Sequence, residues 1–285
     1  MKLSSLFLVF LALYSCDGAR ILVIGPFGSA SHKFFYMPIA EGLAEKGHHV
    51  TVVTSFPPKE KKENIREIVL GDAAGSPVNE LNFFQMRKTL KLFGVIPTIP
   101  FRFWFLGGVI QKIYENLVSN QEFQQLQREE KFDIVLVDAV LNDFCLPVVD
   151  QWKVPIIQLS PAIGPPWVLK NMGVPYHLAS YPFSWNIQTD QMTFYQRLLN
   201  TLEVLLVTAA RETLLLNPLN SRIQKDYPGA RTIQEIEKEI SLCIVNSHPA
   251  LNFVRPLPPT VIEVSGMQIK PKPKPLPTVP LYILL

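Results

Sequence analysis

The chain has 285 residues, of which 48% are hydrophobic, and it carries 27 lysines and arginines against 24 aspartates and glutamates. This length and composition are enough to build a core in one large or two ordinary domains. The net charge of +3 is too small to favour nucleic-acid binding, and the basic cluster at residues 59–62 is expected in a solvated loop.

Residues 1–19 are predicted to be a secretory signal peptide. Lys2 supplies a positive start, and the apolar run 3–14 is shorter than the roughly 20 residues that a membrane span needs. Cys16 and Gly18 occupy suitable positions before a cleavage site, although cleavage one residue later is nearly as well supported. We therefore expect the mature chain to reside in the endoplasmic reticulum lumen or to be secreted, with an uncleaved anchor as the alternative.

Two cysteines, Cys145 and Cys243, remain after the expected cleavage. Each lies in an element that is predicted to be buried. Two cysteines are too few for a disulfide framework, and their spacing does not match a metal site. We expect two free buried thiols and no metal, with a disulfide between them as the alternative that an oxidising lumen permits.

Seven runs of aliphatic and β-branched residues alternate with helical patterns along the chain. They are predicted strands at residues 21–24, 50–54, 67–70, 134–137, 155–159, 241–246 and 261–264. Continuous apolar strands that alternate with helices indicate a parallel sheet covered on both faces. The sequence therefore predicts an α/β fold with a Rossmann-like, doubly wound parallel sheet over residues 20–269.

The first predicted strand is followed by a glycine and serine loop and a helix over residues 32–46. Ser29 or Ser31 is expected to cap the start of this helix, and Gly47 is expected to end it in a left-handed conformation. The glycines at 25 and 28 lack the G-x-G-x-x-G spacing, so no dinucleotide fingerprint is present.

A long insertion, residues 82–130, separates the third and fourth predicted strands and contains a cluster of aromatic residues. The cluster consists of Phe93, Phe101, Phe103, Trp104 and Phe105. Long connections are often functional, so we expect a wall for an apolar ligand, with ordinary core or a membrane-surface patch as alternatives. Pro97 and Pro100 argue against a transmembrane helix here. A second helical block, residues 191–216, is expected to be buried packing.

Two titratable residues are expected at the carboxyl edge of the sheet. His32 follows the first strand and Asp138 ends the fourth, and in a doubly wound order 3-2-1-4-5 these strands are neighbours at the switch point. A carboxylate that holds one imidazole nitrogen favours proton uptake at the other. The sequence thus indicates that His32 is a general base and that Asp138 is the carboxylate that holds it. Asp143 is an alternative partner for His32, and a purely structural role is the alternative for His32 itself.

Residues 270–277, KPKPKPLP, are predicted to be extended, as in an interdomain linker. We assign 270–285 to this linker. A linker followed by so few residues suggests that something normally follows it.

Four segments in order carry a family resemblance: GSASHKFF, LAEKGHHVTVVTSFP, FDIVLVD and VIEVSGMQIKPKPKPLP. Together they resemble the animal UDP-glycosyltransferases of the UDP-glucuronosyltransferase type, over nearly the whole chain. The resemblance implies a GT-B fold, in which two Rossmann-like domains face each other. The amino-terminal domain binds the acceptor and the carboxyl-terminal domain binds most of the nucleotide sugar, and this chain would be the acceptor domain.

Carried over by position, the resemblance makes His32 the catalytic base and Asp138 its orienting partner. It implies no cofactor or metal, and a UDP-sugar as co-substrate once a donor domain is supplied. The expected acceptor-binding residues are Phe34, Phe101, Phe103, Trp104 and Phe105. Lys33 stands where many members of the family have an aromatic residue, which leaves the acceptor preference open.

Two functions follow as expectations. The first is transfer of a sugar, with inversion, from a UDP-sugar to a hydroxyl group of a small lipophilic acceptor, as in detoxification. The second is a catalytically inactive lumenal or secreted protein that binds hydrophobic small molecules or regulates intact transferases. Association with full-length transferases or with a membrane surface is expected in either case.

Overall fold

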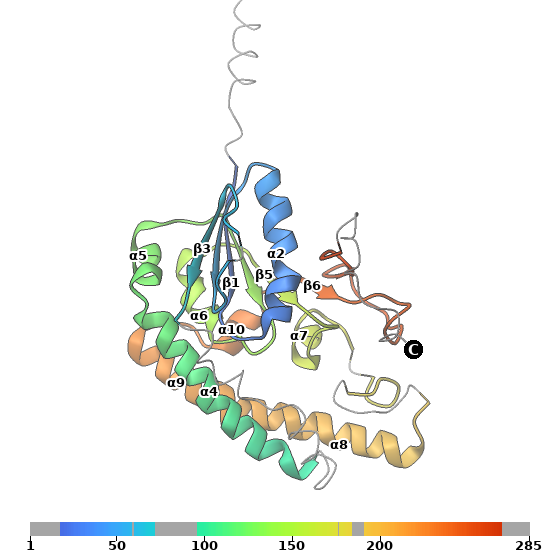
Figure 1. Cartoon of the computed structure of the whole chain (residues 1–285). Helices are drawn as coiled ribbons and strands as arrows, with labels where there is room; N and C mark the ends of the chain where they lie inside the picture. Colours follow the sequence, from blue (N-terminus) through green and yellow to red (C-terminus); the bar gives the residue numbers. More distant parts are fainter. Residues whose placement is uncertain (1–17, 59, 72–95, 176, 184–190, 270–285) are drawn as a thin grey trace, which may run out of the picture.

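The computed structural model describes residues 18–58, 60–71, 96–175, 177–183 and 191–269. Its centre is a seven-stranded parallel sheet in the order β3-β2-β1-β4-β5-β6-β7 (Figure 1). The strands are β1 (Arg20–Gly25), β2 (His49–Thr54), β3 (Ile65–Val69), β4 (Ile134–Asp138), β5 (Ile156–Ser160), β6 (Leu242–Asn246) and β7 (Val261–Val264). The predicted fold class and the central order are confirmed, and β6 and β7 extend the sheet beyond β5.

Helices cover both faces of the sheet. They are α2 (Ala30–Glu45), α4 (Ile99–Ser119), α5 (Gln121–Glu129), α6 (Cys145–Val149), α7 (Pro166–Asn171), α8 (Phe194–Ala210), α9 (Asn217–Asp226) and α10 (Ile233–Glu237). Short 3₁₀ turns span Ile96–Thr98 and Asp150–Trp152, and a π-helical segment, η4 (Arg211–Leu216), joins α8 to α9. This arrangement is the doubly wound architecture that the alternating pattern predicts.

The two faces have separate cores. On one face α2 packs Phe35, Tyr36 and Ala40 against the side chains of β1 and β2 that point its way, such as Val23 and Val52. The opposite side chains of the same strands join a larger core with α4, α5, α6, α9 and α10. Because successive side chains of a strand point to opposite faces, the continuous apolar strands fill both cores.

The first helix differs from its prediction at one end. It begins at Ala30, after Ser29, and the Ser29 side chain makes no capping hydrogen bond, because its Oγ lies 2.5 Å from Oγ of Ser31. The predicted end is confirmed, since Gly47 has φ of 88° and donates its N–H to the carbonyl of Ala44. Glycine adopts this conformation at little cost.

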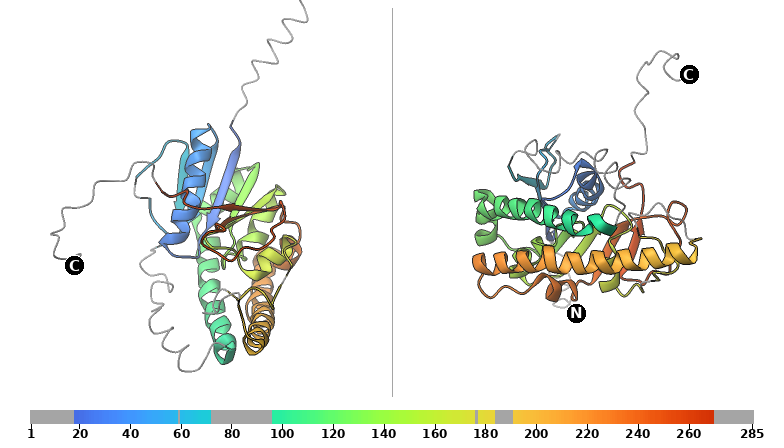
Figure 2. Two further views of the ribbon diagram at one scale, coloured as in Figure 1. Left: turned by 90° about the vertical axis from the view of Figure 1, so that its right-hand side faces the viewer. Right: turned by 90° about the horizontal axis from the view of Figure 1, so that it is seen from below.

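The block at 191–216 is only partly buried, which corrects the expectation of a buried helix. Arg211 and Glu203 lie inside. Along α8, however, a row of apolar side chains is exposed: Phe194, Tyr195, Leu198, Leu202, Leu205 and Leu206. Helices α4 and α8 pack against each other and run side by side beyond the carboxyl edge of the sheet (Figure 2). Among the described helices, none combines the length and apolar character needed to cross a membrane.

The described cysteines are both buried and free, so the prediction for Cys145 and Cys243 is confirmed. Residues 1–17 of the predicted signal peptide (1–19), the predicted linker at 270–285 and Phe93 lie outside the described residues.

Candidate functional site

His32 and Asp138 meet at the carboxyl edge of the sheet. Nδ1 of His32, in the first turn of α2, lies 2.5 Å from Oδ2 of Asp138, the last residue of β4. The contact follows from the topology, because β1 and β4 pair directly, with Ile24 opposite Val137. The expected contact between the two side chains is therefore present at the switch point of the sheet.

The environment of Asp138 makes it an acceptor for two donors. Its side chain is only 1% exposed, and its second oxygen, Oδ1, accepts the N–H of Val140 at 2.9 Å. Burial raises the pKa of Asp138, while the hydrogen bonds from His32 and Val140 act in the opposite direction. An ionised carboxylate only accepts hydrogen bonds, so a neutral imidazole beside it would carry its proton on Nδ1 and leave a lone pair on Nε2.

Glycines allow the first loop to approach this pair closely. Gly28 has φ of 136°, and a Cβ atom built on it would lie 2.7 Å from Cγ of His32. A Cβ atom on Gly25 would lie 3.1 Å from Cβ of Asp138. A side chain at position 28 would therefore displace the imidazole and would also strain the backbone.

Asn142 ties together the two loops that carry the pair. Its Oδ1 accepts the N–H of Phe27 at 2.7 Å, and its Nδ2 donates to the carbonyl of Phe27 at 3.1 Å. Nδ2 also donates to the carbonyl of Val140, and the intervening Leu141 has φ of 60°. This fully buried amide is a positioning residue that the sequence analysis missed, because no periodicity or spacing marks it.

Asp143 does not partner His32. Its Oδ1 accepts from Nη2 of Arg211 at 2.8 Å, and the same nitrogen lies 2.5 Å from Oε1 of Glu237. The Arg211 guanidinium also lies over the ring of Trp167. Burial raises the pKa of Glu237 to about 7, against the opposing effect of Arg211. This buried network attaches the loop after β4 to η4 and α10, and the alternative role for Asp143 is wrong.

A cleft of about 440 Å³ opens beside His32. It is lined by Ser31, His32, Phe34, Phe35, Pro161, Ala162, Asn246 and Gln268. Phe34, one of the expected acceptor-binding residues, is 54% exposed at its wall. The loop after β5 and the end of β6 complete the cleft, and sequence analysis did not identify either of them.

The other expected acceptor-binding residues lie on α4 and do not line this cleft. Phe101 and Trp104 are 65% and 66% exposed, and Phe101 packs against both Trp104 and Phe105. Phe103 faces the opposite way and is buried in the larger core. The helical repeat thus divides the cluster into an exposed group and a core residue, and its role in acceptor binding stays a prediction.

Lys33 points away from the cleft. Its Nζ donates to the carbonyl of Phe56 at 2.8 Å and to Oε2 of Glu67 at 2.5 Å. The lysine therefore connects the start of α2 to β3 and to the loop after β2. Among the described cleft residues, Phe34 rather than Lys33 provides the aromatic surface next to His32.

The fold and the site define a Rossmann-like α/β domain that holds an imidazole and a buried carboxylate beside a cleft at its switch point. The profile of the family described as UDP-glucoronosyl and UDP-glucosyl transferase matches residues 19–280. The chain belongs to this family.

Individual relatives agree with the family. The chain is 31% identical over 266 residues to UDP-glycosyltransferase UGT5 of Dactylopius coccus, covering 88% of this chain and 48% of that protein. It is 27% identical to 2-hydroxyacylsphingosine 1-beta-galactosyltransferase of Mus musculus, covering 94% of this chain and 49% of that protein. The chain therefore spans about half the length of these curated relatives.

Among solved structures, the chain resembles CalG4, the calicheamicin glycosyltransferase. The TM-score is 0.47 at 12% identity, with 87% of this chain and 53% of that chain covered.

Proposed function

We propose that the chain is the acceptor-binding part of an inverting UDP-glycosyltransferase of GT-B architecture. The observation that carries the proposal is the 2.5 Å contact between His32 and the buried Asp138, at the edge of an open cleft. It is supported by membership of a family whose description names UDP-glucuronosyl and UDP-glucosyl transfer.

In the proposed reaction, an acceptor hydroxyl group lies in the cleft with its proton directed at Nε2 of His32. As the acceptor oxygen attacks the anomeric carbon of the UDP-sugar, the new carbon–oxygen bond forms and the bond to the departing UDP breaks. The proton passes to Nε2, and the positive imidazolium is stabilised by Asp138. A single displacement inverts the anomeric carbon, and no side-chain nucleophile is needed.

The cleft supports a small lipophilic acceptor. Phe34, Phe35, Pro161 and Ala162 contribute apolar surface, and the polar lining residues are Ser31, His32, Asn246 and Gln268. Apolar walls with a few convergent polar groups are typical of small-molecule sites. As part of the proposal, the signal peptide would direct the chain to the endoplasmic reticulum lumen or to secretion.

A chimera tests the proposed function. Residues 18–269 would be joined to the remaining carboxyl-terminal part of the Dactylopius coccus relative, whose length is only 48% covered by this chain. We expect UDP release that depends on both a UDP-sugar and a lipophilic phenol or alcohol, with the glycoside identified by mass spectrometry. The unjoined carboxyl-terminal part is the control. A folded chimera that forms no glycoside across UDP-glucose, UDP-glucuronate and UDP-galactose would contradict the proposal.

A glycine substitution tests the close packing around the imidazole. Gly28→Ala in the chimera should lower turnover by about 10- to 100-fold, because displacement of a catalytic group by about 1 Å is costly. Gly42→Ala is the matched control, since a Cβ atom there meets nothing within 4 Å. The measurement is kcat for each variant, with folding checked by circular dichroism. Equal kcat values for the two variants would show that the loop does not position His32.

A further inference from the structure

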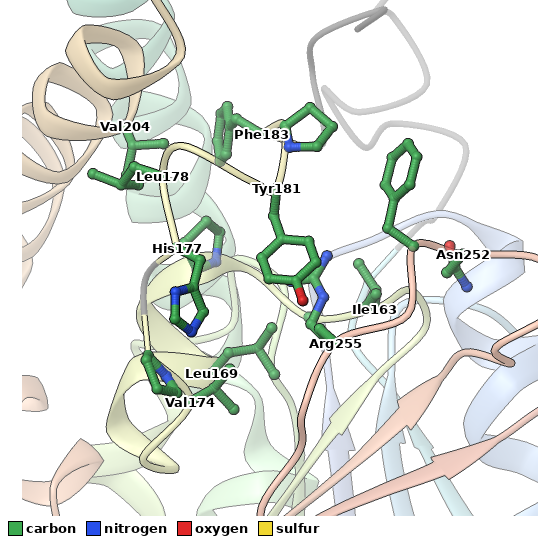
Figure 3. A pocket seen from close by; sticks show the side chains of 15 residues that line it. Ile163, Leu169, Val174, His177, Leu178, Tyr181, Phe183, Val204, Asn252 and Arg255 are labelled. Carbon is green, nitrogen blue, oxygen red and sulfur yellow. The ribbon is translucent and has the colours of Figure 1, made fainter. Parts of the chain in front are cut away.

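A second cavity is lined in part by the loop that follows β5 (Figure 3). Its volume is about 250 Å³, and its lining residues come from that loop, α7, the stretches 174–175 and 177–183, α8 and the connection between β6 and β7. The apolar side chains in its wall include Ile163, Leu169, Val174, Leu178, Phe183 and Val204. It is thus a largely apolar pocket, larger than the apolar cavities of about 150 Å³ that hold a benzene molecule.

One cationic side chain, Arg255, reaches into this apolar wall. Its guanidinium lies 4.9 Å from the centre of the Tyr181 ring, and Figure 3 shows it beside Tyr181. Nε of Arg255 is buried and has no hydrogen-bond partner among the described residues. No described carboxylate forms a salt bridge with Arg255, although Glu263 acts on it at longer range.

Arg211, which is a buried arginine, provides a contrast with the partly buried Arg255. Arg211 is neutralised by Asp143 and Glu237 within hydrogen-bond distance. Arg255 is removed from water in part, and this burial lowers its pKa, yet the described chain offers it no anion. A buried N–H without an acceptor lowers stability, and an anion bound beside it would provide that acceptor.

We infer that this cavity binds a small amphiphile with an apolar body and one anionic head, such as a carboxylate. The apolar body occupies the space between Leu169, Leu178 and Val204, and the anionic head accepts from the guanidinium of Arg255. Stacking on Tyr181 holds the guanidinium plane in place, as is common for arginine.

This site is distinct from the cleft beside His32. Pro161 and Ala162 line the cleft, whereas the next two residues of the same loop, Ile163 and Gly164, line the second cavity. The inference goes beyond the proposed function, because anion binding here requires neither a UDP-sugar nor His32. If the chimera transfers no sugar, the inference about anion binding is unaffected. If no anion binds in the second cavity, the proposed sugar transfer is unaffected.

Isothermal titration calorimetry with octanoate and with octan-1-ol tests the inference on the purified chain. The two probes share an apolar tail and differ in the head group. We expect octanoate to bind at least about tenfold more tightly, because hydrogen bonds to charged groups contribute more than neutral ones. Equal affinities, or no octanoate binding, would overturn the inference.

Variants locate the binding. Arg255→Gln should weaken octanoate binding by about tenfold or more while leaving octan-1-ol unchanged, and Arg255→Lys should keep part of the preference. Arg222→Gln makes the same change of charge at an arginine whose partners are Asp226 and Glu115, away from the cavity, and should bind both probes normally. Thermal unfolding establishes that each variant is folded. Octanoate binding by folded Arg255→Gln at the original affinity would place the ligand elsewhere, for example on the exposed face of α8, and would refute the assignment.

Discussion

Replacing His32 by alanine in the chimera is expected to lower turnover by about 10²- to 10⁴-fold, the usual contribution of a general base. Acceptor binding should persist, because most of the cleft wall is formed by other side chains, including Phe34 and Pro161. Initial rates of UDP release give kcat, and equilibrium binding of the acceptor is measured separately. The change should therefore appear in kcat rather than in the affinity for the acceptor.

The control for this prediction is His49→Ala. His49 is the exposed first residue of β2, at the opposite end of the sheet from the cleft. It should leave turnover unchanged. If the His32→Ala variant kept turnover within about threefold of the parent, His32 would not be the general base, and its role would be structural.

Asp138→Asn should reduce turnover by at least about 100-fold with little effect on folding. Asparagine keeps the shape and can still accept the N–H of Val140, but its amide nitrogen would then donate to Nδ1 of His32. The imidazole would carry its proton on Nε2, the nitrogen that has to receive the acceptor proton. The tautomer can be read from ¹⁵N chemical shifts of the imidazole, alongside kcat.

Asp133→Asn provides the matched control for this substitution. Asp133 lies just before the other end of β4, is exposed, and accepts the backbone N–H of Arg20. Its kcat should equal that of the parent. Unchanged turnover in Asp138→Asn, with the imidazole proton moved to Nε2, would show that the pair does not act as a base.

The pattern of the sequence predicts the centre of this molecule well because that centre depends on local signals. Continuous apolar runs such as 134–137 mark buried parallel strands, and the switch-point rule places the residues after β1 and β4 together. The same rule places His32 beside Asp138. Their 2.5 Å contact could therefore be predicted without knowing how the surrounding helices pack.

Other parts of the site depend on contacts between distant side chains, which no local pattern encodes. In the sequence, nothing distinguishes Asn142 from other loop asparagines. Its role becomes visible only through its hydrogen bonds to the backbone of Phe27. Arg211 and Asp143 are charges that would ordinarily be assigned to the surface, yet they pair inside the protein. The orientation of the aromatic residues of α4 could not be predicted for a different reason: residue type alone does not give the position around the helix, which turns Phe103 inward and Phe101 outward.

The pairing of β1 with β4 also has a consequence for folding. His32 and Asp138 are separated by 106 residues, and β2, β3, α4 and α5 lie between them in the chain. Contacts of such long sequence separation form only after a large loop has closed, which slows folding and places them among its late events. During refolding, helix content would therefore recover before the His32–Asp138 contact. The return of that contact would report the pairing of β1 with β4, which joins the two halves of the sheet.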